Sequence, residues 1–238
     1  MQRDVFIIMD IEYLKNRVKN SSRFYRWYHA FNYYRLRFSP SVRGKGNKII
    51  NKAFCRRLSF DIVGNNNYIE IGTGTVVTDT KIYIRGNNHR LTIGYGSHFK
   101  KGELWFEDVN NEIYIGNKVS VEEAHIAVTG INRRIIIGDD CMLSNQVTLR
   151  TGDSHCITDN STGEKINQEK DIVLEEHVWL GNGVTVLKGV TMGKNSIAGT
   201  KSLVTTDISS NCLCAGIPAK IIRTDINWDR KRFVHNSR

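Results

Sequence analysis

The sequence predicts an all-β solenoid, a coil of stacked rungs built from short parallel strands. Two repeats support this prediction. Isoleucine-glycine pairs recur every 22 residues, beginning at Ile71, Ile93, Ile115 and Ile137. After residue 170, apolar side chains recur every six residues, at Leu174, Leu180, Val186, Met192, Ala198 and Val204. Internal repeats at a fixed period are the signature of solenoid folds.

A six-residue period matches neither an amphipathic helix, which repeats every 3.6 residues, nor an alternating strand. It suits one strand and one turn of a triangular coil, so that three sides make a rung of 18 residues. The early rungs add four residues at one corner, which gives the period of 22. One rung cannot bury its inward side chains, but stacked rungs share a continuous core. The asparagines before each pair, such as those at 65–67, suit turns with positive φ.

Residues 1–60 form a basic, aromatic segment that we expect to be helical over residues 11–37. Fourteen lysines and arginines against three acidic residues place the chain's formal charge of +10 in this segment. Two interpretations remain open. The segment could cap the open edge of the first rung, or it could lie on a membrane surface as a peripheral contact. The charge also suits an acidic polymer, and we expect no nucleic-acid partner.

Residues 61–210 are the predicted solenoid, and residues 211–238 are a C-terminal cap and tail. The repeat is interrupted once, by a protruding loop over residues 150–170. Long loops on rigid scaffolds often carry function. The loop opens with Asp153, Ser154 and His155. An imidazole near its unperturbed pKa of about 6.5 is a suitable base for removing a proton from a hydroxyl group.

The five cysteines form no Cys-x-x-Cys pair, and this usage favours a reducing compartment. No apolar stretch approaches the roughly 20 residues that span a bilayer, and the run at residues 5–9 does not resemble a secretory signal. We therefore expect a cytoplasmic protein, with the N-terminal segment as the candidate for contact with the inner face of the membrane.

Several motifs in the second half resemble the hexapeptide-repeat acetyltransferases, the family of galactoside, maltose and polysaccharide O-acetyltransferases. Val178-Trp179-Leu180-Gly181 begins shortly after the loop, with Trp179 standing 24 residues after His155. It is followed by the GVTMG, SIAGTKSLVT and AGIPAK segments, which begin at Gly189, Ser196 and Ala215. Together these motifs are specific, although each alone is weak. The resemblance implies a left-handed parallel β-helix, direct transfer from acetyl-CoA, and a homotrimer with sites between subunits.

By this resemblance, His155 is the general base, and Asp153 is a candidate to orient its ring. Backbone N–H groups would stabilise the oxyanion. The six-residue pattern places Trp179 outward, as a wall for the acceptor or pantetheine or as a subunit contact. Asn145 and Gln146, on the rung before the loop, are candidates to face the acceptor. The residues carried over for coenzyme A are Asn182, Gly199, Thr200, Thr205, Lys220 and Arg223. Thr206 stands where many relatives have lysine, which puts one phosphate contact in doubt.

The function predicted is acetyl-CoA-dependent O-acetylation of a sugar or surface polysaccharide. Three alternatives stay open: N-acetylation of an amino sugar or nucleotide sugar, a non-catalytic assembly scaffold, and metal-dependent hydration as in γ-class carbonic anhydrases. The last needs three zinc ligands, and the solenoid histidines form no close pair, so we expect no metal. We expect His177 to be an exposed corner residue.

Overall fold

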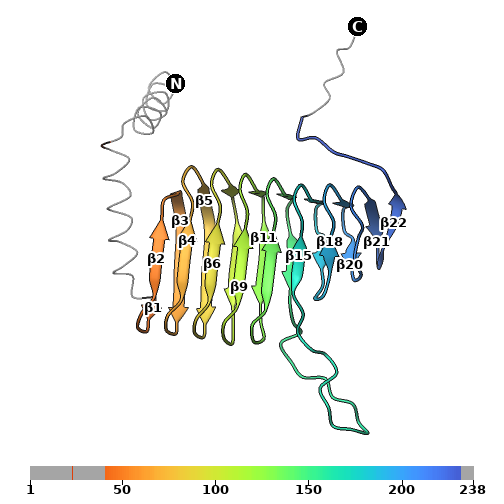
Figure 1. The fold of residues 1–238 in the computed structure, drawn as a ribbon. Helices are drawn as coiled ribbons and strands as arrows, with labels where there is room; N and C mark the ends of the chain where they lie inside the picture. Colours follow the sequence, from red (N-terminus) through yellow and green to blue (C-terminus); the bar gives the residue numbers. More distant parts are fainter. Residues whose placement is uncertain (1–22, 24–40, 232–238) are drawn as a thin grey trace, which may run out of the picture. The chain divides into compact units, whose positions relative to one another are not determined.

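The computed structural model describes Arg23 and residues 41–231, and from Ser41 onward the chain forms a parallel β-solenoid of about seven turns (Figure 1). Each turn has three faces. A 15-stranded sheet wraps around two of them, because the long strands near its start bend through the corner, and a seven-stranded sheet forms the third. No helix among the described residues is long and apolar enough to cross a bilayer.

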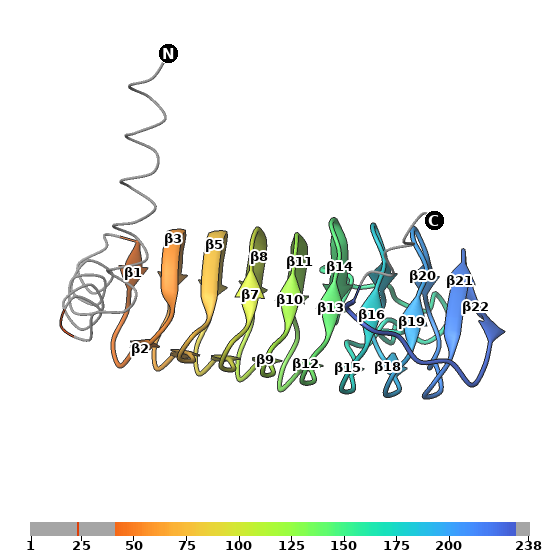
Figure 2. The same ribbon diagram turned by 90° about the horizontal axis from the view of Figure 1, so that it is seen from above.

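The strands fall into three stacks, and Figure 2 shows the strands of the seven-stranded sheet along the lower edge of the coil. The first face holds β1 (Val42–Arg43), the C-terminal parts of β3 (Phe54–Val63) and β5 (Val76–Arg85), and then β8 (Gly102–Phe106), β11 (Ala124–Val128), β14 (Val147–Arg150), β17 (Thr185–Val186) and β20 (Leu203–Val204). The second face holds the N-terminal parts of β3 and β5, and then β7 (His98–Phe99), β10 (Ser120–Val121), β13 (Met142–Leu143), β16 (Trp179–Leu180), β19 (Ile197–Ala198) and β21 (Leu213–Gly216). The third face holds β2 (Lys48–Asn51), β4 (Tyr68–Ile71), β6 (Arg90–Ile93), β9 (Glu112–Ile115), β12 (Arg134–Ile137), β15 (Ile172–Leu174) and β18 (Thr191–Met192).

Three corners join the faces, and each is named here for later use. The wide corner leads from the first face to the third and carries the four additional residues of the long rungs. The narrow corner leads from the second face to the first, and the third corner leads from the third face to the second. The last strand, β22 (Ala219–Arg223), turns back and pairs antiparallel with β21.

The core is a column of aliphatic and aromatic side chains inside the coil. Along β8, Leu104 and Phe106 point inward and are fully buried, and Ile135 and Ile137 of β12 are equally buried. Parallel pairing without a register shift places like positions of successive rungs over one another, such as Ile113 beside Ile135. The six-residue sequence pattern therefore becomes a continuous apolar interior.

A ladder of buried polar side chains runs along the wide corner. The side chains of Asn47, Asn67, His89 and Asn111 each accept a hydrogen bond from the backbone N–H one rung further on, over 2.7–3.2 Å. Asn67, His89 and Asn111 are each about 1% exposed. These bonds satisfy backbone groups that would otherwise be buried without partners. Burial lowers the pKa of His89, so its ring is neutral when it takes an asparagine's place in the ladder.

The solenoid is longer than the sequence predicts. It begins at Val42 rather than at residue 61, and β21 continues the second face beyond residue 210. The first rung escaped detection because Asn51 pairs with Ile71, so the isoleucine of the repeat is missing there. The expected helix over residues 11–37 lies outside the described residues except for Arg23, as does the tail from residue 232.

His89 should make the fold sensitive to mild acid. Because burial lowers its pKa, the unfolded chain takes up a proton below about pH 6.5 that the folded chain resists, so stability falls as the pH drops below that value. We expect His89→Asn, which keeps a ladder acceptor, to show a smaller loss of stability between pH 7 and pH 5. Urea unfolding at fixed protein concentration measures this difference. Equal losses in the two proteins would show that His89 does not cause the acid sensitivity.

Candidate active site

A long loop, residues 151–171, leaves the coil at the wide corner between β14 and β15 and projects from it (Figure 1). Its first residue is anchored to the rung before it. Thr151 is fully buried, and its hydroxyl donates to the backbone carbonyl of Thr129 at 2.9 Å. The backbone N–H of Thr129 in turn donates to the Thr151 hydroxyl at 2.8 Å. The loop therefore starts from a fixed point on the scaffold.

Three side chains close the neck of the loop. The side-chain amide of Asn167 donates to Asp153 Oδ2 at 2.9 Å and to the backbone carbonyl of His155 at 2.8 Å. Its oxygen accepts from the backbone N–H of Ile157 at 2.8 Å. Lys188 donates to the Asp153 carboxylate and, at 3.1 Å, to the Asn167 carbonyl. Hydrogen bonds from Lys188 and then Asn167 hold the pKa of Asp153 below its ordinary value.

His155 is exposed at this neck, with its backbone held and its ring available. Ser154, which precedes it, has a positive φ of 66° and accepts a hydrogen bond from Arg150 Nη2 at 2.9 Å. Within the described part of the chain, the imidazole of His155 makes no hydrogen bond or ion pair. The backbone is thus positioned by neighbours while the side chain stays free for a reacting group, as a general base requires.

The predicted orienting role of Asp153 is not supported by this geometry. Its carboxylate is bonded to Lys188 and Asn167, and no hydrogen bond links it to the His155 ring among residues 41–231. The physical reason is that Lys188, in the turn after β17, forms a charge-assisted hydrogen bond with this carboxylate and so competes with the His155 ring for it. Asp153 therefore holds the loop that carries His155.

The residues expected to meet the acceptor and coenzyme A gather partly at the narrow corner. The backbone carbonyl of Asn145 accepts from Gly183, and that of Asn182 accepts from Lys201, each at 2.8 Å. These bonds stack Asn145 and Gln146, then Asn182, then Gly199 and Thr200 on three successive rungs. Lys201, the alternative cation for the phosphate contact that Thr206 lacks, lies here too, with Nζ 3.4 Å from Gln146 Oε1.

The other residues expected to bind coenzyme A lie elsewhere on the coil. Thr205 follows β20 at the wide corner, while Lys220 and Arg223 are exposed on β22. His155 stands at the wide corner. The width of the first face therefore separates it from the narrow-corner column, which is the stack of Asn145, Gln146, Asn182, Gly199 and Thr200. Within one chain, the structure does not bring the predicted base and this column together.

Trp179 points outward from β16 and is covered by a C-terminal strap, defined here as residues 224–231. The Trp228 indole is 5.8 Å from that of Trp179 and stacks on His177, with ring centroids 3.9 Å apart and planes at 9°. Trp228 Nε1 also donates to the His177 carbonyl at 2.8 Å. The strap thus fixes one side of Trp179, a contact that sequence reasoning missed because the two tryptophans are far apart in the chain.

The expectation that His177 is simply an exposed corner residue is wrong. Its φ of 58° fits a corner, but its ring lies 2.6 Å from Asp140 Oδ2 and 3.0 Å from the Trp228 carbonyl. Arg230 Nε donates to Asp140 Oδ1 at 2.9 Å. Burial alone would raise the pKa of Asp140, but bonds from His177 and Arg230 outweigh it and lower that pKa. The third corner is therefore the anchor of the strap.

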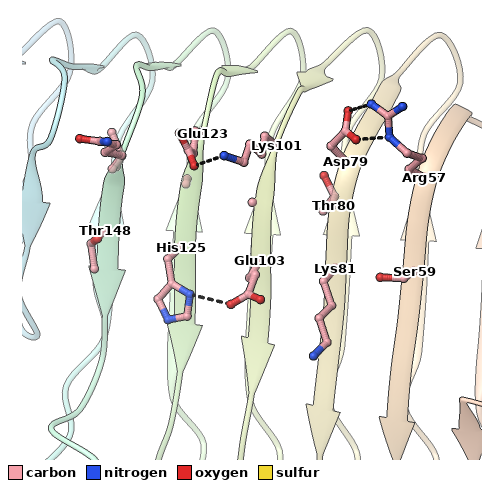
Figure 3. A pocket seen from close by; sticks show the side chains of 14 residues that line it. Arg57, Ser59, Asp79, Thr80, Lys81, Lys101, Glu103, Glu123, His125 and Thr148 are labelled. Atoms are coloured by element: carbon pink, nitrogen blue, oxygen red, sulfur yellow. Dashed lines mark hydrogen bonds and ion pairs between the residues drawn. The ribbon is translucent and has the colours of Figure 1, made fainter.

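A groove of about 610 Å³ follows the narrow corner beside the first face (Figure 3). Ion pairs between successive rungs cross it, with Arg57 on Asp79 and Lys101 2.7 Å from Glu123. Deeper on the face, His125 Nδ1 lies 3.4 Å from Glu103. Burial lowers the pKa of His125, against the opposing effect of Glu103. Of the residues predicted to face the acceptor, Gln146 lines this groove, whereas the charged residues that alternate along it at 22-residue spacing were not singled out from the sequence.

Two solved structures match the chain over most of its length. The polySia-specific acetyltransferase NeuO has 32% sequence identity and a TM-score of 0.72, covering 82% of this chain and 90% of that one. This chain belongs to the hexapeptide-repeat acetyltransferase family. The polysialic acid O-acetyltransferase OatWY has 30% identity and the same TM-score, with 82% and 93% covered. The left-handed parallel β-helix predicted for the family member is confirmed.

Curated members of the family match over shorter segments. The polysialic acid O-acetyltransferase of Escherichia coli O1:K1 / APEC is 40% identical over 91 residues, which are 38% of this chain and 30% of that protein. The galactoside O-acetyltransferase of Lactococcus lactis is 37% identical over 97 residues, 41% and 46% respectively. The matched segments thus span less than half of these relatives. No protein-family model matches the sequence.

Asp153→Asn should loosen the loop. The substitution removes the charge of the lysine-bonded carboxylate, so we expect lower hydrogen-exchange protection over residues 153–170 at pH 7. Folding lowers the pKa of Asp153. The ion pair between Asp153 and Lys188 is therefore fully formed above the ordinary aspartate pKa of about 4, and it is lost as the pH falls through the lower pKa of the folded state. Glu164→Gln, in the same loop, is the control. Equal protection in both variants would contradict the anchoring role.

Trp228→Ala should release the strap. Trp228 is 7% exposed, and losing its stacking and its N–H donor should lower the local opening free energy by about 3 kcal/mol. Trp228→Phe keeps a stacked ring without the donor and should cost about 1 kcal/mol. Hydrogen exchange of residues 224–231 measures both. Unchanged protection in Trp228→Ala would show that Arg230 alone holds the segment.

Proposed function

We propose that this protein transfers an acetyl group from acetyl-CoA to a hydroxyl group of a surface polysaccharide. The observation that supports it is His155, whose backbone is held at a closed loop neck while its ring stays unbonded and exposed. The polysialic acid O-acetyltransferases among the relatives support O-acetylation and a polymeric acceptor. No feature of the described residues favours N-acetylation or a scaffold over this reaction.

The proposed reaction is a direct transfer. The unprotonated nitrogen of His155 takes the proton of an acceptor hydroxyl as its oxygen attacks the thioester carbonyl. Backbone N–H groups stabilise the resulting oxyanion. When the intermediate collapses, the carbon–sulfur bond breaks, the imidazolium returns its proton to the leaving thiolate, and the products are the acetyl ester and free coenzyme A. No metal takes part in this scheme.

We propose that the donor lies along the narrow-corner column, against the backbone of Asn182, Gly199 and Thr200. Lys201, Lys220 and Arg223 are exposed cations that suit its phosphates. Because His155 stands at another corner of the same chain, the working site joins the loop of one copy to the narrow corner of a second. A homotrimer closes such heterologous contacts into a ring. The exposed Ile157 and Ile166 of the loop are apolar groups that such a contact would cover.

The acceptor in this proposal is a capsular, exopolysaccharide or lipopolysaccharide-type glycan, with polysialic acid as the first polymer to test. The site of action is the cytoplasm, where acetyl-CoA is made, and all five cysteines being free agrees with a reducing compartment. A role of the basic segment at the inner membrane face remains part of this proposal and rests on its charge alone.

His155→Ala should abolish turnover without abolishing donor binding. Loss of a general base costs about 100-fold or more in kcat, which we expect to see as slower release of coenzyme A thiol in the presence of oligosialic acid. Acetyl-CoA at 100 times its Kd should still stabilise the variant by about 2.7 kcal/mol, seen as a rise in Tm. Arg223→Ala should reduce that rise.

His98→Ala is the matched control, since His98 is an exposed histidine on the second face. Equal turnover in His155→Ala and wild type would contradict the assignment of the base. No change in Tm with millimolar acetyl-CoA, in a folded protein, would overturn acetyl-CoA as the donor.

A further inference from the structure

A column of five side chains crosses the outer side of the first face. Parallel pairing places Asp61, Tyr83, Trp105, Ala127 and Arg150 beside one another on consecutive rungs. Rungs of a parallel sheet are about 4.8 Å apart, so Trp105 and Arg150 flank Ala127 at about 10 Å from each other.

The aromatic pair is held rigidly. Tyr83 and Trp105 stack with ring centroids 3.7 Å apart and planes at 21°. Arg85 covers the other side of Tyr83 at 4.0 Å, and Asp61 holds Arg85 through a 2.8 Å bond. Both aromatic rings remain partly exposed. The indole of Trp105 is therefore fixed by Tyr83, with the His125 ring 6.2 Å away, and remains partly exposed at the surface.

A hollow lies between Trp105 and Arg150, because the side chain of the buried Ala127 is only a methyl group. The hollow has a volume of about 240 Å³, and Ser154 forms part of its rim. His125 lines it as well and is shared with the groove of the narrow corner, so the two depressions adjoin. Ser154 precedes His155 directly, which brings the hollow next to the proposed base.

The charge at the hollow is carried by Arg150. Its guanidinium is exposed and bonds to the Ser154 hydroxyl, and no carboxylate pairs with it among the described residues. The acidic groups nearby are Glu107 on the rim, Glu103, whose carboxylate lies beside His125, and Asp153, whose carboxylate is bonded to Lys188 and Asn167. Arg150 is thus available for an external anion, and a planar guanidinium pairs best with a carboxylate or phosphate.

We propose that Trp105, Ala127 and Arg150 form a subsite for a carboxylate-bearing sugar unit of the acceptor glycan. The apolar C–H face of the sugar packs on the Trp105 indole above the floor at Ala127, and Arg150 binds its carboxylate. Shaped apolar surfaces with a few placed polar groups are the usual form of small-ligand sites. The neighbouring unit extends into the groove along His125. The placement of this subsite beside the reacting hydroxyl rests on the proposed function, while sugar binding itself does not.

Direct binding tests the proposal without using turnover. The probe is a sialic acid oligosaccharide, with a neutral oligosaccharide of equal length for comparison, and the readout is calorimetric titration of the full-length protein. We expect the acidic oligosaccharide to bind more tightly. Arg150→Gln should weaken binding by about tenfold or more, because it removes a charge-assisted bond to the carboxylate. Trp105→Ala should also weaken binding by about tenfold, because it removes the aromatic surface on which the sugar packs. In Arg150→Gln the preference over the neutral oligosaccharide should disappear.

The controls are Tyr114→Ala and Arg90→Gln, an aromatic ring and an arginine that lie outward on the third face. Both should bind the oligosaccharide as wild type does. Equal binding by Trp105→Ala, Arg150→Gln and wild type overturns the subsite while leaving the proposed acetyl transfer intact. A change of oligomeric state in Trp105→Ala, measured by light scattering, also overturns it and assigns the face to a subunit contact. If the acidic oligosaccharide binds as expected but is never acetylated, the subsite stands and the proposed function fails.

Discussion

The hydrogen bonding between successive rungs is the constraint on which the rest of this structure depends. The strands of one turn pair with strands one turn away, so no rung is stable alone and the corners must stack in register. The buried ladder of Asn67, His89 and Asn111 applies the same rule to side chains. A residue's surroundings are thus decided chiefly by the residues one period before and after it.

This constraint explains where new groups can be added to the scaffold. Residues within a face cannot be inserted without shifting every outward side chain to the interior, whereas a corner can lengthen without disturbing the strands. The additional residues of this chain all lie at the wide corner. Each early rung has four of them there, and the loop 151–171 is inserted at the same corner. At the loop neck, Thr151 bonds to the backbone of the preceding rung, and Asn167 ties the two sides of the loop to each other. The backbone of His155 is thereby held although it stands on a projecting loop.

The outward-facing side chains differ from rung to rung, unlike the apolar side chains of the core. Along the first face, alternating charges such as Arg57 and Asp79 or Lys101 and Glu123 neutralise one another across rungs. Arg150 lies in a different column, beside Ala127, and no ion pair with a carboxylate is formed by it among the described residues. Across the third corner, the strap of Trp228 and Arg230 fastens the end of the described chain to Asp140 and His177. Outward residues are therefore free to specialise because they do not maintain the core.

The sequence by itself determined the coil, the break in it and the histidine within the break, because period and interruption are properties of residue order. The stacking is predicted by the repeated isoleucines Ile71, Ile93, Ile115 and Ile137. The first rung has Asn51 at the equivalent position, so the repeat did not reveal it. Only the tertiary structure decided that Asp153 binds Lys188 rather than His155, and that Trp179 and His177 lie under the strap. It also assembled Trp105, Ala127 and Arg150 into one column. Those contacts join residues that are distant in the chain, and outward side chains follow no period that would reveal their partners.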